Sequence, residues 1–492
     1  MSSSFATEPE SLGFKEVAAG EQQSLNQFEQ RCLDQAQSEH DSARTSLSEV
    51  ASNDGGSLQR MATSFFSPRL QAQRKHVWFQ FLFNIFALAA LTISVFSLYW
   101  GALYNRNSHL GKVRILAVIQ DDGSLPGALP AIIDANPGGW HVYTSEQFQS
   151  KYHINETQVD SKIEHLVHTQ KFWMSLNVKP NATNALHESL QNPSADPFVA
   201  SNYFEAIYES GRDPTNFRSS ILPLLQEVEL SFQKNYTSSY LPELLSHTNL
   251  SNASPANLAA AGNLEFGSKD MRPFSNYVLL GPLQVGLIFC VLLTFFQLAM
   301  FGPLHGMVSP KLKPAHILIY RYCISMTAYF FLSLFFCTVS AIFQVDFTPT
   351  FGRAGFMVYW MSTWLIMAAV GGANENVLSL IIAWAPQYMG FWLVFWIVSN
   401  ISPSFFPLAL MNNFYRYGYM MPIHNAMDIY KVIFLNTYKG TLGRNYGILC
   451  AWVVINSILF VPVLKLVGNR MKQNAQRAAA AAATTAAAAE KA

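Results

Sequence analysis

Hydrophobic residues in this chain gather into long stretches that carry almost no charge. The first stretch, Val77 to Tyr99, is uncharged and has about the ~20 residues that a helix needs to cross the hydrocarbon core of a bilayer. A polar region follows, and the next stretch of this kind begins only at Val278. This pattern predicts an α-helical polytopic membrane protein with about six transmembrane helices.

Five further spans are predicted after the polar region. They cover Val278 to Phe301, Ile317 to Phe343, Phe356 to Trp384, Tyr388 to Leu410 and Tyr446 to Val467. The run Gly371 to Asn376 is polar and contains two adjacent glycines, and it predicts an interruption of the span that contains it. The chain is thus divided into a first transmembrane helix at 77–103, an inserted region at 104–277 and a five-helix transmembrane domain at 278–467.

Basic residues beside the spans predict the orientation of the chain. Arg74 and Lys75 precede the first span, and Lys311 and Lys313 lie between the second and third spans. Because basic residues are enriched in the cytosolic loops of membrane proteins, we expect both termini in the cytosol and residues 104–277 outside it.

One segment disagrees with this orientation. By parity, residues 411–445 lie outside the cytosol, yet they carry four basic residues and one acidic residue, namely Arg416, Lys431, Lys439, Arg444 and Asp428. Both flanking spans are strongly hydrophobic, so the external placement is kept.

The two ends of the chain are polar or repetitive. Residues 1–76 are rich in Ser, Gln and Glu. They predict a disordered cytosolic tail, because such a segment cannot bury enough apolar surface to become ordered. Residues 468–492 form an Ala-rich cytosolic tail.

The polar region 104–277 has the pattern of a folded domain. Val113 to Ile119, Gln170 to Val178 and Phe204 to Glu209 predict strands, and Phe217 to Tyr236 has apolar residues at helical spacing. We therefore expect an inserted extracytoplasmic α/β domain.

Sequons of the form Asn-X-Ser/Thr concentrate in this region. They predict glycosylation at Asn155, Asn181, Asn235, Asn249 and Asn252, since a domain outside the cytosol meets the glycosylation machinery. Sequons also arise by chance, and Pro255 directly after the last sequon disfavours its use.

Composition and motifs narrow the class of function. Only 13% of the residues are charged, against roughly 25% in soluble globular proteins. The net charge of +1 argues against a nucleic-acid partner, which requires a basic surface. The five cysteines lack metal-ligand spacing, and no phosphate-binding loop, hydrolase elbow or zinc-protease motif occurs. We therefore expect no enzymatic activity, cofactor or metal site.

Glu375 is the main candidate for a functional residue within the membrane. A carboxylate in an apolar span is costly unless it is paired, protonated or hydrated. Two interpretations follow. Glu375 either contacts a substrate or a proton at a helix break, or it is a hydrated residue at a bend near the membrane interface.

A second set of candidates lies in Asn413 to Lys431, where aromatic residues are mixed with Arg416, His424 and Asp428. Pro422 divides this segment, and His424 and Asp428 can pair if both lie on one helix. We interpret the three side chains as candidates for substrate contact. The alternative is anchoring at the membrane interface, which suits aromatic and basic residues.

Three motifs occur in the same order as the spans and the inserted domain. They are YWGALY at 99–104, FWMSLNV with PNAT within 172–183, and NFYRYGY with MPIHNA within 413–426. With these motifs, the chain from Val77 to Lys472 resembles the fungal nitrosoguanidine-resistance protein family (Sng-type). It is also distantly similar to the phage-infection (Pip/YhgE-type) proteins and to ABC-2-type permease domains.

The resemblance implies a multi-pass protein of the plasma membrane or an endomembrane that contributes to resistance to toxic compounds. The leading hypothesis is a permease-like protein that exports toxic hydrophobic small molecules or lipids. The alternatives are a non-transporting membrane organiser or scaffold whose outer domain binds a partner, and a membrane-embedded hydrolase or transferase. The expected partners are membrane lipids, with either a second copy of the chain or a separate ATP-binding subunit.

Overall fold

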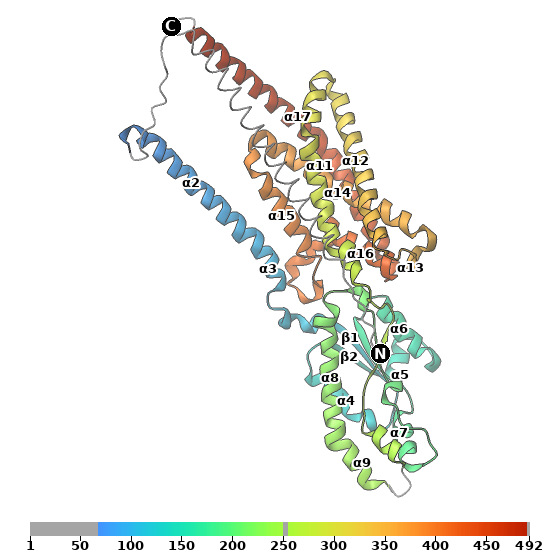
Figure 1. Ribbon diagram of the computed structural model, residues 1–492. Coiled ribbons are helices and arrows are strands. Elements are labelled where there is room, and N and C mark those ends of the chain that lie inside the picture. Colours follow the sequence, from blue (N-terminus) through green and yellow to red (C-terminus); the bar gives the residue numbers. More distant parts are fainter. Residues whose placement is uncertain (1–66, 249–253, 490–492) are drawn as a thin grey trace, which may run out of the picture. The chain divides into compact units, whose positions relative to one another are not determined.

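A computed structural model describes residues 67–248 and 254–489 of the protein (Figure 1). Most of the predicted N-terminal tail lies outside the described residues, as do Asn249 and Asn252. The chain divides into two compact units, Met1–Ile85 and Phe86–Ala492. The second unit holds the sheet and the described helices from α3 (Ser97–Leu103) onward.

Five helical segments of the described residues are long and apolar enough to cross a membrane. They are Gln71–Leu103, Tyr277–Lys311, Pro314–Ile342, Thr348–Trp384 and Lys439–Thr484. Their α-helices are α2 (Gln71–Leu91), α3, α11 (Gly286–Val308), α12 (Pro314–Ile342), α13 (Thr348–Phe351), α14 (Gly355–Trp384) and α17 (Leu442–Ala489). The helical membrane class is confirmed, whereas the predicted number of spans is not.

The predicted span Tyr388 to Leu410 accounts for the difference. Its helix, α15 (Met389–Ile401), has 13 residues. At ~1.5 Å per residue it is about 20 Å long, shorter than the ~30 Å hydrocarbon core. Pro403 follows the helix closely, and proline cannot continue a helix because it lacks an amide hydrogen. The chain then reaches the inserted domain, where Asn216 Nδ2 donates to the carbonyl of Phe405 (2.9 Å).

The predicted interruption at Gly371 to Asn376 is wrong, since α14 passes through it without a break. The side-chain amides of this run bond to neighbouring helices instead of ending α14. Asn374 Nδ2 donates to the carbonyl of Val291 on α11 (3.2 Å). Asn376 Nδ2 donates to the carbonyl of Asn456 on α17 (2.9 Å). The polar run is therefore a contact surface between helices.

Replacing Gly371 with alanine should destabilise this helix packing. An added Cβ would stand 2.6 Å from the Tyr329 hydroxyl and 2.9 Å from Cγ2 of Thr294, and overpacking of this kind costs roughly 1–3 kcal/mol. The matched control is Gly302→Ala on α11, where nothing lies within 4 Å of an added Cβ and alanine favours the helix. Thermal unfolding in detergent micelles measures both variants. An unchanged midpoint for Gly371→Ala would contradict the close approach of Tyr329.

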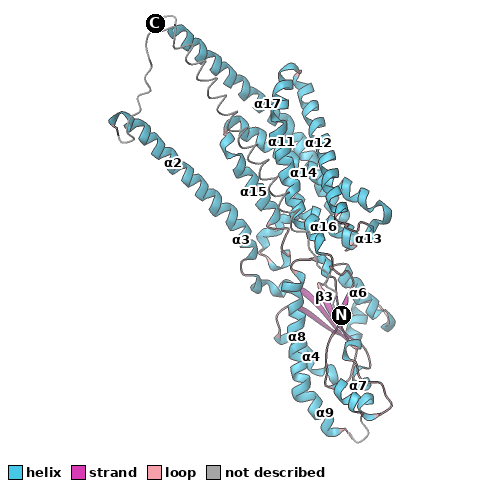
Figure 2. Ribbon diagram, viewed as in Figure 1, coloured by secondary structure: helices cyan, strands magenta, loops and turns pink. Residues whose placement is uncertain are grey.

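The inserted domain is built on a five-stranded sheet of order β2-β1-β3-β4-β5 (Figure 2). The strands are β1 (Arg114–Ile119), β2 (Gly139–Thr144), β3 (Met174–Val178), β4 (Phe204–Tyr208) and β5 (Gly267–Asp270). β1 pairs in parallel with β2 and β3, β4 is antiparallel to β3, and β5 is parallel to β4. The sheet with its helices is an α/β domain, as the pattern of this region predicted.

The hydrophobic pattern predicted the three central strands of the sheet but not its two edge strands, β2 and β5. Four of the six residues of β1 and all five residues of β3 are buried, which is typical of strands that are covered on both faces. β2 has no fully buried residue, and β5 consists of the polar residues GSKD. An edge strand of this kind lacks the hydrophobic signal on which sequence reasoning depends.

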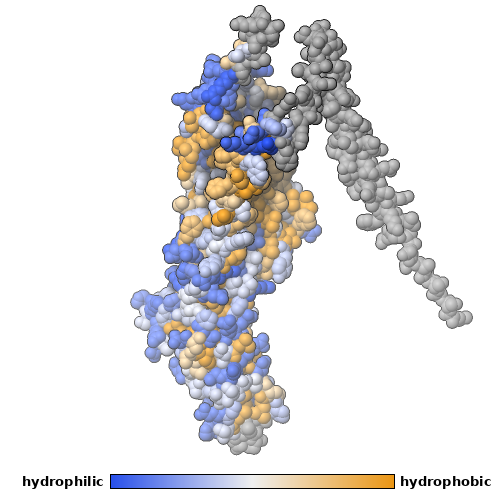
Figure 3. Space-filling model, turned by 90° about the vertical axis from the view of Figure 1, so that its left-hand side faces the viewer, coloured by the Kyte–Doolittle hydropathy of each residue, from blue (hydrophilic) through white to orange (hydrophobic). Residues whose placement is uncertain are grey.

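Helices cover both faces of the sheet. They are α4 (Leu129–Ala135), α5 (Ser145–Tyr152), α6 (Val159–His168), α7 (Ala182–Gln191), α8 (Leu222–Asn235), α9 (Leu241–His247) and α10 (Pro255–Ala261). Leu186 of α7 and Phe232 of α8 belong to the core on one face, whereas Phe148 of α5 and Ile163 of α6 belong to the core on the other. Hydrophilic residues are prominent on the surface of this domain, and hydrophobic residues gather over the bundle of long helices (Figure 3).

The segment after α15 joins the long helices to the inserted domain. It contains the 3-10 helix Asn413–Met420 and helix α16 (Pro422–Leu435), which begins at the predicted dividing proline. Leu410 belongs to the core of the inserted domain, and Lys112 Nζ donates to the carbonyl of Met411 (3.2 Å). These contacts place α16 and the 3-10 helix directly against the domain.

Candidate functional site

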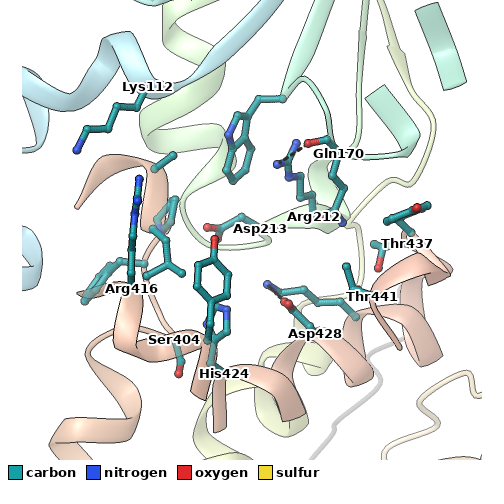
Figure 4. A pocket seen from close by; sticks show the side chains of 18 of the residues that line it. Lys112, Gln170, Arg212, Asp213, Ser404, Arg416, His424, Asp428, Thr437 and Thr441 are labelled. Atoms are coloured by element: carbon teal, nitrogen blue, oxygen red, sulfur yellow. Dashed lines mark hydrogen bonds and ion pairs between the residues drawn. The ribbon is translucent and has the colours of Figure 1, made fainter. Parts of the chain in front are cut away.

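A polar cavity of about 490 Å³ lies between the inserted domain and the segment that contains α16 (Figure 4). Three of the four candidates from the sequence, Arg416, His424 and Asp428, line this cavity. The fourth, Glu375, lies apart from it in helix α14. We call the cavity the basic pocket, because of the charges described next.

Positive charge dominates the basic pocket. The cationic side chains that line it are Lys112, Arg114, Arg212, Arg416, Lys431 and Arg444, and the carboxylates are Asp213 and Asp428. Six cations minus two carboxylates leave a net charge of +4, in a chain whose formal net charge is +1. In the described part of the chain, no group of three or more His, Cys, Asp or Glu could hold a metal ion. The charge of the pocket instead favours an anion.

Arg212 is held in the wall that the inserted domain contributes. Its Nη1 donates to the carbonyl of Phe172 (2.8 Å) and its Nη2 to the carbonyl of Gln170 (3.3 Å), the contact drawn in Figure 4. The guanidinium also lies 3.7 Å from the centre of the Trp173 ring. Burial lowers the pKa of Arg212 to about 10, so the group keeps its charge at neutral pH. No carboxylate among the described residues forms an ion pair with it.

Arg114 and Arg416 reach the basic pocket from opposite walls. Arg114 begins β1 in the inserted domain, and Arg416 lies in the 3-10 helix that precedes α16. Both side chains are exposed, and within residues 67–248 and 254–489 neither has an ion-pair partner. A free guanidinium can bind a phosphate or carboxylate through two parallel hydrogen bonds. The two arginines are therefore suited to bind an anion in the pocket.

His424 and Asp428 lie one turn apart on α16 but bond to different partners. Asp428 lies 3.4 Å from Lys431 Nζ and 3.9 Å from Arg444 Nη2, and His424 Nδ1 lies 3.1 Å from the carbonyl of Pro403. Burial raises the pKa of Asp428, but Lys431 and His424 outweigh it and bring the pKa below its usual value. Burial lowers the pKa of His424. At neutral pH, Asp428 is therefore charged and His424 is not.

Sequence reasoning missed the wall that the inserted domain contributes. Lys112 and Arg114 lie at the start of β1, Trp173 directly precedes β3, and Arg212 follows β4. These residues are far apart in the chain, so no local spacing connects them. The one available signal was the motif FWMSLNV, which contains Trp173.

An apolar groove lies close to the basic pocket. It has a volume of about 550 Å³ between α11 and α12, and its lining includes Val285, Phe289 and Phe335. A smaller cavity shares Asp213, Ser404 and Lys431 with the basic pocket. The same small cavity is also lined by Leu280, Leu283 and Gln284. These residues are sequence neighbours of Gly281, Pro282 and Val285, which line the groove. A cationic pocket beside an apolar groove matches the two halves of an anionic amphiphile.

Glu375 forms an ion pair among the long helices. Its Oε1 lies 3.0 Å from Nη2 of Arg321 on α12, and its Oε2 accepts a hydrogen bond from Ser325 Oγ (2.8 Å). Only 5% of Glu375 is exposed. Glu375 is therefore a buried, ion-paired residue in a continuous helix, and not an exposed residue at a helix bend. Sequence reasoning missed Arg321, although an arginine inside the predicted span Ile317 to Phe343 is itself a signal.

Three of the predicted glycosylation sites lie in the described part of the inserted domain. Asn155 and Asn181 are exposed, and Asn235 is partly exposed at the end of α8. Asn249 and Asn252 lie outside the described residues. Glycosylation at all five positions stays a prediction.

Comparison with known proteins identifies the family. Residues 84–458 match the family described as "Protein of unknown function (DUF3533)". An uncharacterized endoplasmic reticulum membrane protein of Saccharomyces cerevisiae is 47% identical over 446 residues, which cover 87% of this chain and 88% of the yeast protein. No solved structure matches the chain. The family match covers both the inserted domain and most of the long helices, and the chain therefore belongs to the DUF3533 family of proteins of unknown function.

Proposed function

We propose that this protein is a permease-like protein of the endoplasmic reticulum membrane that binds amphiphiles with an anionic headgroup and moves them. The amphiphiles are lipids or toxic hydrophobic compounds. One observation carries the proposal, namely the basic pocket of net charge +4 beside the apolar groove of α11 and α12. The location of the yeast relative supports the choice of membrane, and the resemblance to nitrosoguanidine-resistance proteins supports a part in resistance.

The headgroup site, rather than the groove, sets affinity and selectivity. Lipid tails are as apolar as the side chains of the groove, so a tail gains little by leaving the bilayer for it. An anionic headgroup, in contrast, meets Arg114, Arg212 and Arg416 from the two walls of the basic pocket. Each hydrogen bond to such a charged group contributes about 1.5–3 kcal/mol. The pocket should therefore prefer anionic headgroups to zwitterionic ones.

The proposed topology has six crossings, with the short helix α15 as the fifth. The end of α15 lies beside the segment that contacts the inserted domain, since the Tyr417 hydroxyl donates to the carbonyl of Ser399 (3.0 Å). The chain thus returns to the side of the inserted domain before α17 begins. A bilayer can thin locally around a short helix at modest cost. Both termini then lie in the cytosol and the inserted domain in the lumen.

Glycosylation tests this topology. Endoglycosidase treatment of the protein from its native host should increase its electrophoretic mobility, because the sequons then face the lumen. Replacing the asparagines of four sequons with glutamine should abolish this shift, and the four are Asn155, Asn181, Asn235 and Asn249. The untreated wild-type protein and its mobility provide the control. A protein that carries no glycan in its host would contradict either the lumenal placement or the use of these sequons.

Reconstitution of the full-length chain in liposomes tests the proposed function. Two fluorescent lipids with the same tails are compared, one with an anionic headgroup and one with a zwitterionic headgroup. The anionic lipid should bind and change leaflet faster than in protein-free liposomes, and the zwitterionic lipid should not. Equal rates for both lipids with and without protein would overturn the proposal. An ATP-binding subunit that co-purifies with the chain would identify the energy source.

A second candidate function is a non-transporting membrane organiser whose inserted domain binds a partner. One observation favours it: the cavity beside Glu375 has a volume of about 20 Å³, too small for a headgroup to pass. The two candidates differ in one measurement. An organiser binds the anionic lipid in liposomes without changing the rate at which the lipid crosses the bilayer.

A further inference from the structure

Several buried polar groups without partners lie on the helices that pack around Glu375. On α11, α12 and α14, five neutral side chains bury atoms that have no hydrogen-bond partner among the described residues. These are both ring nitrogens of His305, both amide atoms of Gln297, the hydroxyls of Tyr320 and Tyr329, and Oδ1 of Asn376. The exposed fraction is 7% for His305, 4% for Gln297 and 1% for Tyr329. An unpaired buried group of this kind costs about 1–3 kcal/mol, so these groups indicate a ligand other than the protein itself.

These groups form a polar seam across α11, α12 and α14. The ring of His305 on α11 lies 5.7 Å from the ring of Tyr320, which directly precedes the arginine that pairs with Glu375. Farther along α12, the Tyr329 hydroxyl lies against Gly371 of α14, where it would be 2.6 Å from an added Cβ. Gly371 and Glu375 are one helical turn apart. The seam therefore passes directly beside the carboxylate.

The space beside Glu375 limits what the ligand can be. The cavity there has a volume of about 20 Å³, and its polar lining includes Tyr322, Asn376, Asn456 and Ser457. A cavity of at least ~10–15 Å³ with two to four polar partners can hold one water molecule. It cannot hold a lipid headgroup or a drug. A proton delivered through water fits both the size of the cavity and the chemistry of a carboxylate.

We propose that Glu375 is an intramembrane proton-binding site that water reaches along the polar seam. A proton from water adds to one carboxylate oxygen of Glu375, and no other bond to the side chain changes. Arg321 keeps its own proton and loses its anionic partner, so the pair gains one positive charge. Glu375 is the single acidic residue in the five candidate spans of the described residues.

The other titratable groups around Glu375 are few. α12 contributes Tyr320, Arg321, Tyr322 and Tyr329, and α11 contributes His305. α17 contributes only neutral groups to the lining of the small cavity, namely Asn456, Ser457, Val453 and Phe460. Arg321 is thus the one fixed charge that opposes protonation. Protonation would free Arg321 from its carboxylate, which is a discrete change at the contact of α12 and α14. The inference stands whether or not the basic pocket binds a lipid.

Infrared spectroscopy of the full-length protein in lipid nanodiscs tests the proposal. Acidification should produce the carbonyl band of a buried carboxylic acid, and Glu375→Gln should lose that band while other bands are retained. Arg321→Gln should make the band appear at a pH higher by about one unit or more, because a neighbouring cation favours the carboxylate. The matched control is Asp346→Asn, which removes an exposed acid outside the helices and should leave the band in place.

Two results would overturn the proposal. One is a band that persists in Glu375→Gln or never forms in the wild-type protein. The other is a band whose pH dependence does not change in Arg321→Gln. Size-exclusion elution and circular dichroism check that each variant folds. If Glu375→Gln does not fold, Glu375→Asp keeps a carboxyl group at the site, and its band should move in frequency relative to the wild-type protein. An unmoved band in Glu375→Asp would assign the signal to another residue and contradict the proposal.

Discussion

Reversing the charges of Arg114 and Arg416 together should lower the affinity for an anionic lipid at least about 100-fold. A basic residue near an anionic lipid contributes about 1 kcal/mol, and a glutamate in its place adds a repulsion of similar size. The double variant Arg114→Glu/Arg416→Glu should therefore lose about 4 kcal/mol, where each 1.4 kcal/mol is about tenfold. Calorimetric titration of the purified protein with a short-chain phosphatidic acid is the measurement.

A variant with the same change in total charge provides the control for this prediction. Lys162 and Lys234 lie on helices α6 and α8 of the inserted domain and do not line the basic pocket. Lys162→Glu/Lys234→Glu should change the affinity by about twofold or less, because neither side chain contacts the pocket and salt screens interactions between distant charges. Equal losses in both double variants would show that only the overall charge attracts the lipid. Full affinity in Arg114→Glu/Arg416→Glu would remove the basic pocket from the proposed function.

Replacing Arg321 with leucine should destabilise the protein by roughly 3–5 kcal/mol. The variant leaves Glu375 buried without its cationic partner, and breaking a buried ion pair from one side carries a cost of this size. Adding Glu375→Gln to Arg321→Leu should restore much of the loss, because no uncompensated charge then remains. Unfolding by a denaturing detergent, followed by circular dichroism, measures the free energy of unfolding of the two variants.

An exposed ion pair of the inserted domain provides the control for this second prediction. Lys269 Nζ lies 2.5 Å from Glu164 Oε1, and 45% of the Lys269 side chain is exposed. Lys269→Leu should change stability by less than about 1 kcal/mol, as is typical of ion pairs at the surface. A similar small change in Arg321→Leu would mean that water screens Glu375 as fully as it screens Glu164.

The sequence determined the features that repeat locally along the chain. Long apolar stretches identified the membrane class because the bilayer thickness requires them. The buried strand β1 was recognised because burial on both faces leaves a continuous apolar run, and β3 was recognised from the alternation along residues 170–178. Arg416, His424 and Asp428 were found together because one short segment carries all three.

Tertiary structure decided the rest. The edge strands β2 and β5 are strands because they pair with β1 and β4, although their own side chains give no strand pattern. The run Gly371 to Asn376 remains helical because its glycines and amides contact neighbouring helices, which local propensity does not describe. α15 is shorter than its hydrophobic stretch because the chain turns toward the inserted domain at Pro403.

The candidate sites show most clearly the difference between what the sequence predicts and what only the tertiary structure reveals. Arg212 and Arg416 line one cavity, and Arg321 and Glu375 form one ion pair, yet each pair is widely separated in the chain. Hydrophobic periodicity encodes which face of an element is buried. It does not encode which distant side chain that face meets. A buried charge is costly unless it is paired, and its partner is known only once the helices have packed. For this reason the sequence identified Glu375 as a candidate, and only the structure identified Arg321 as its partner.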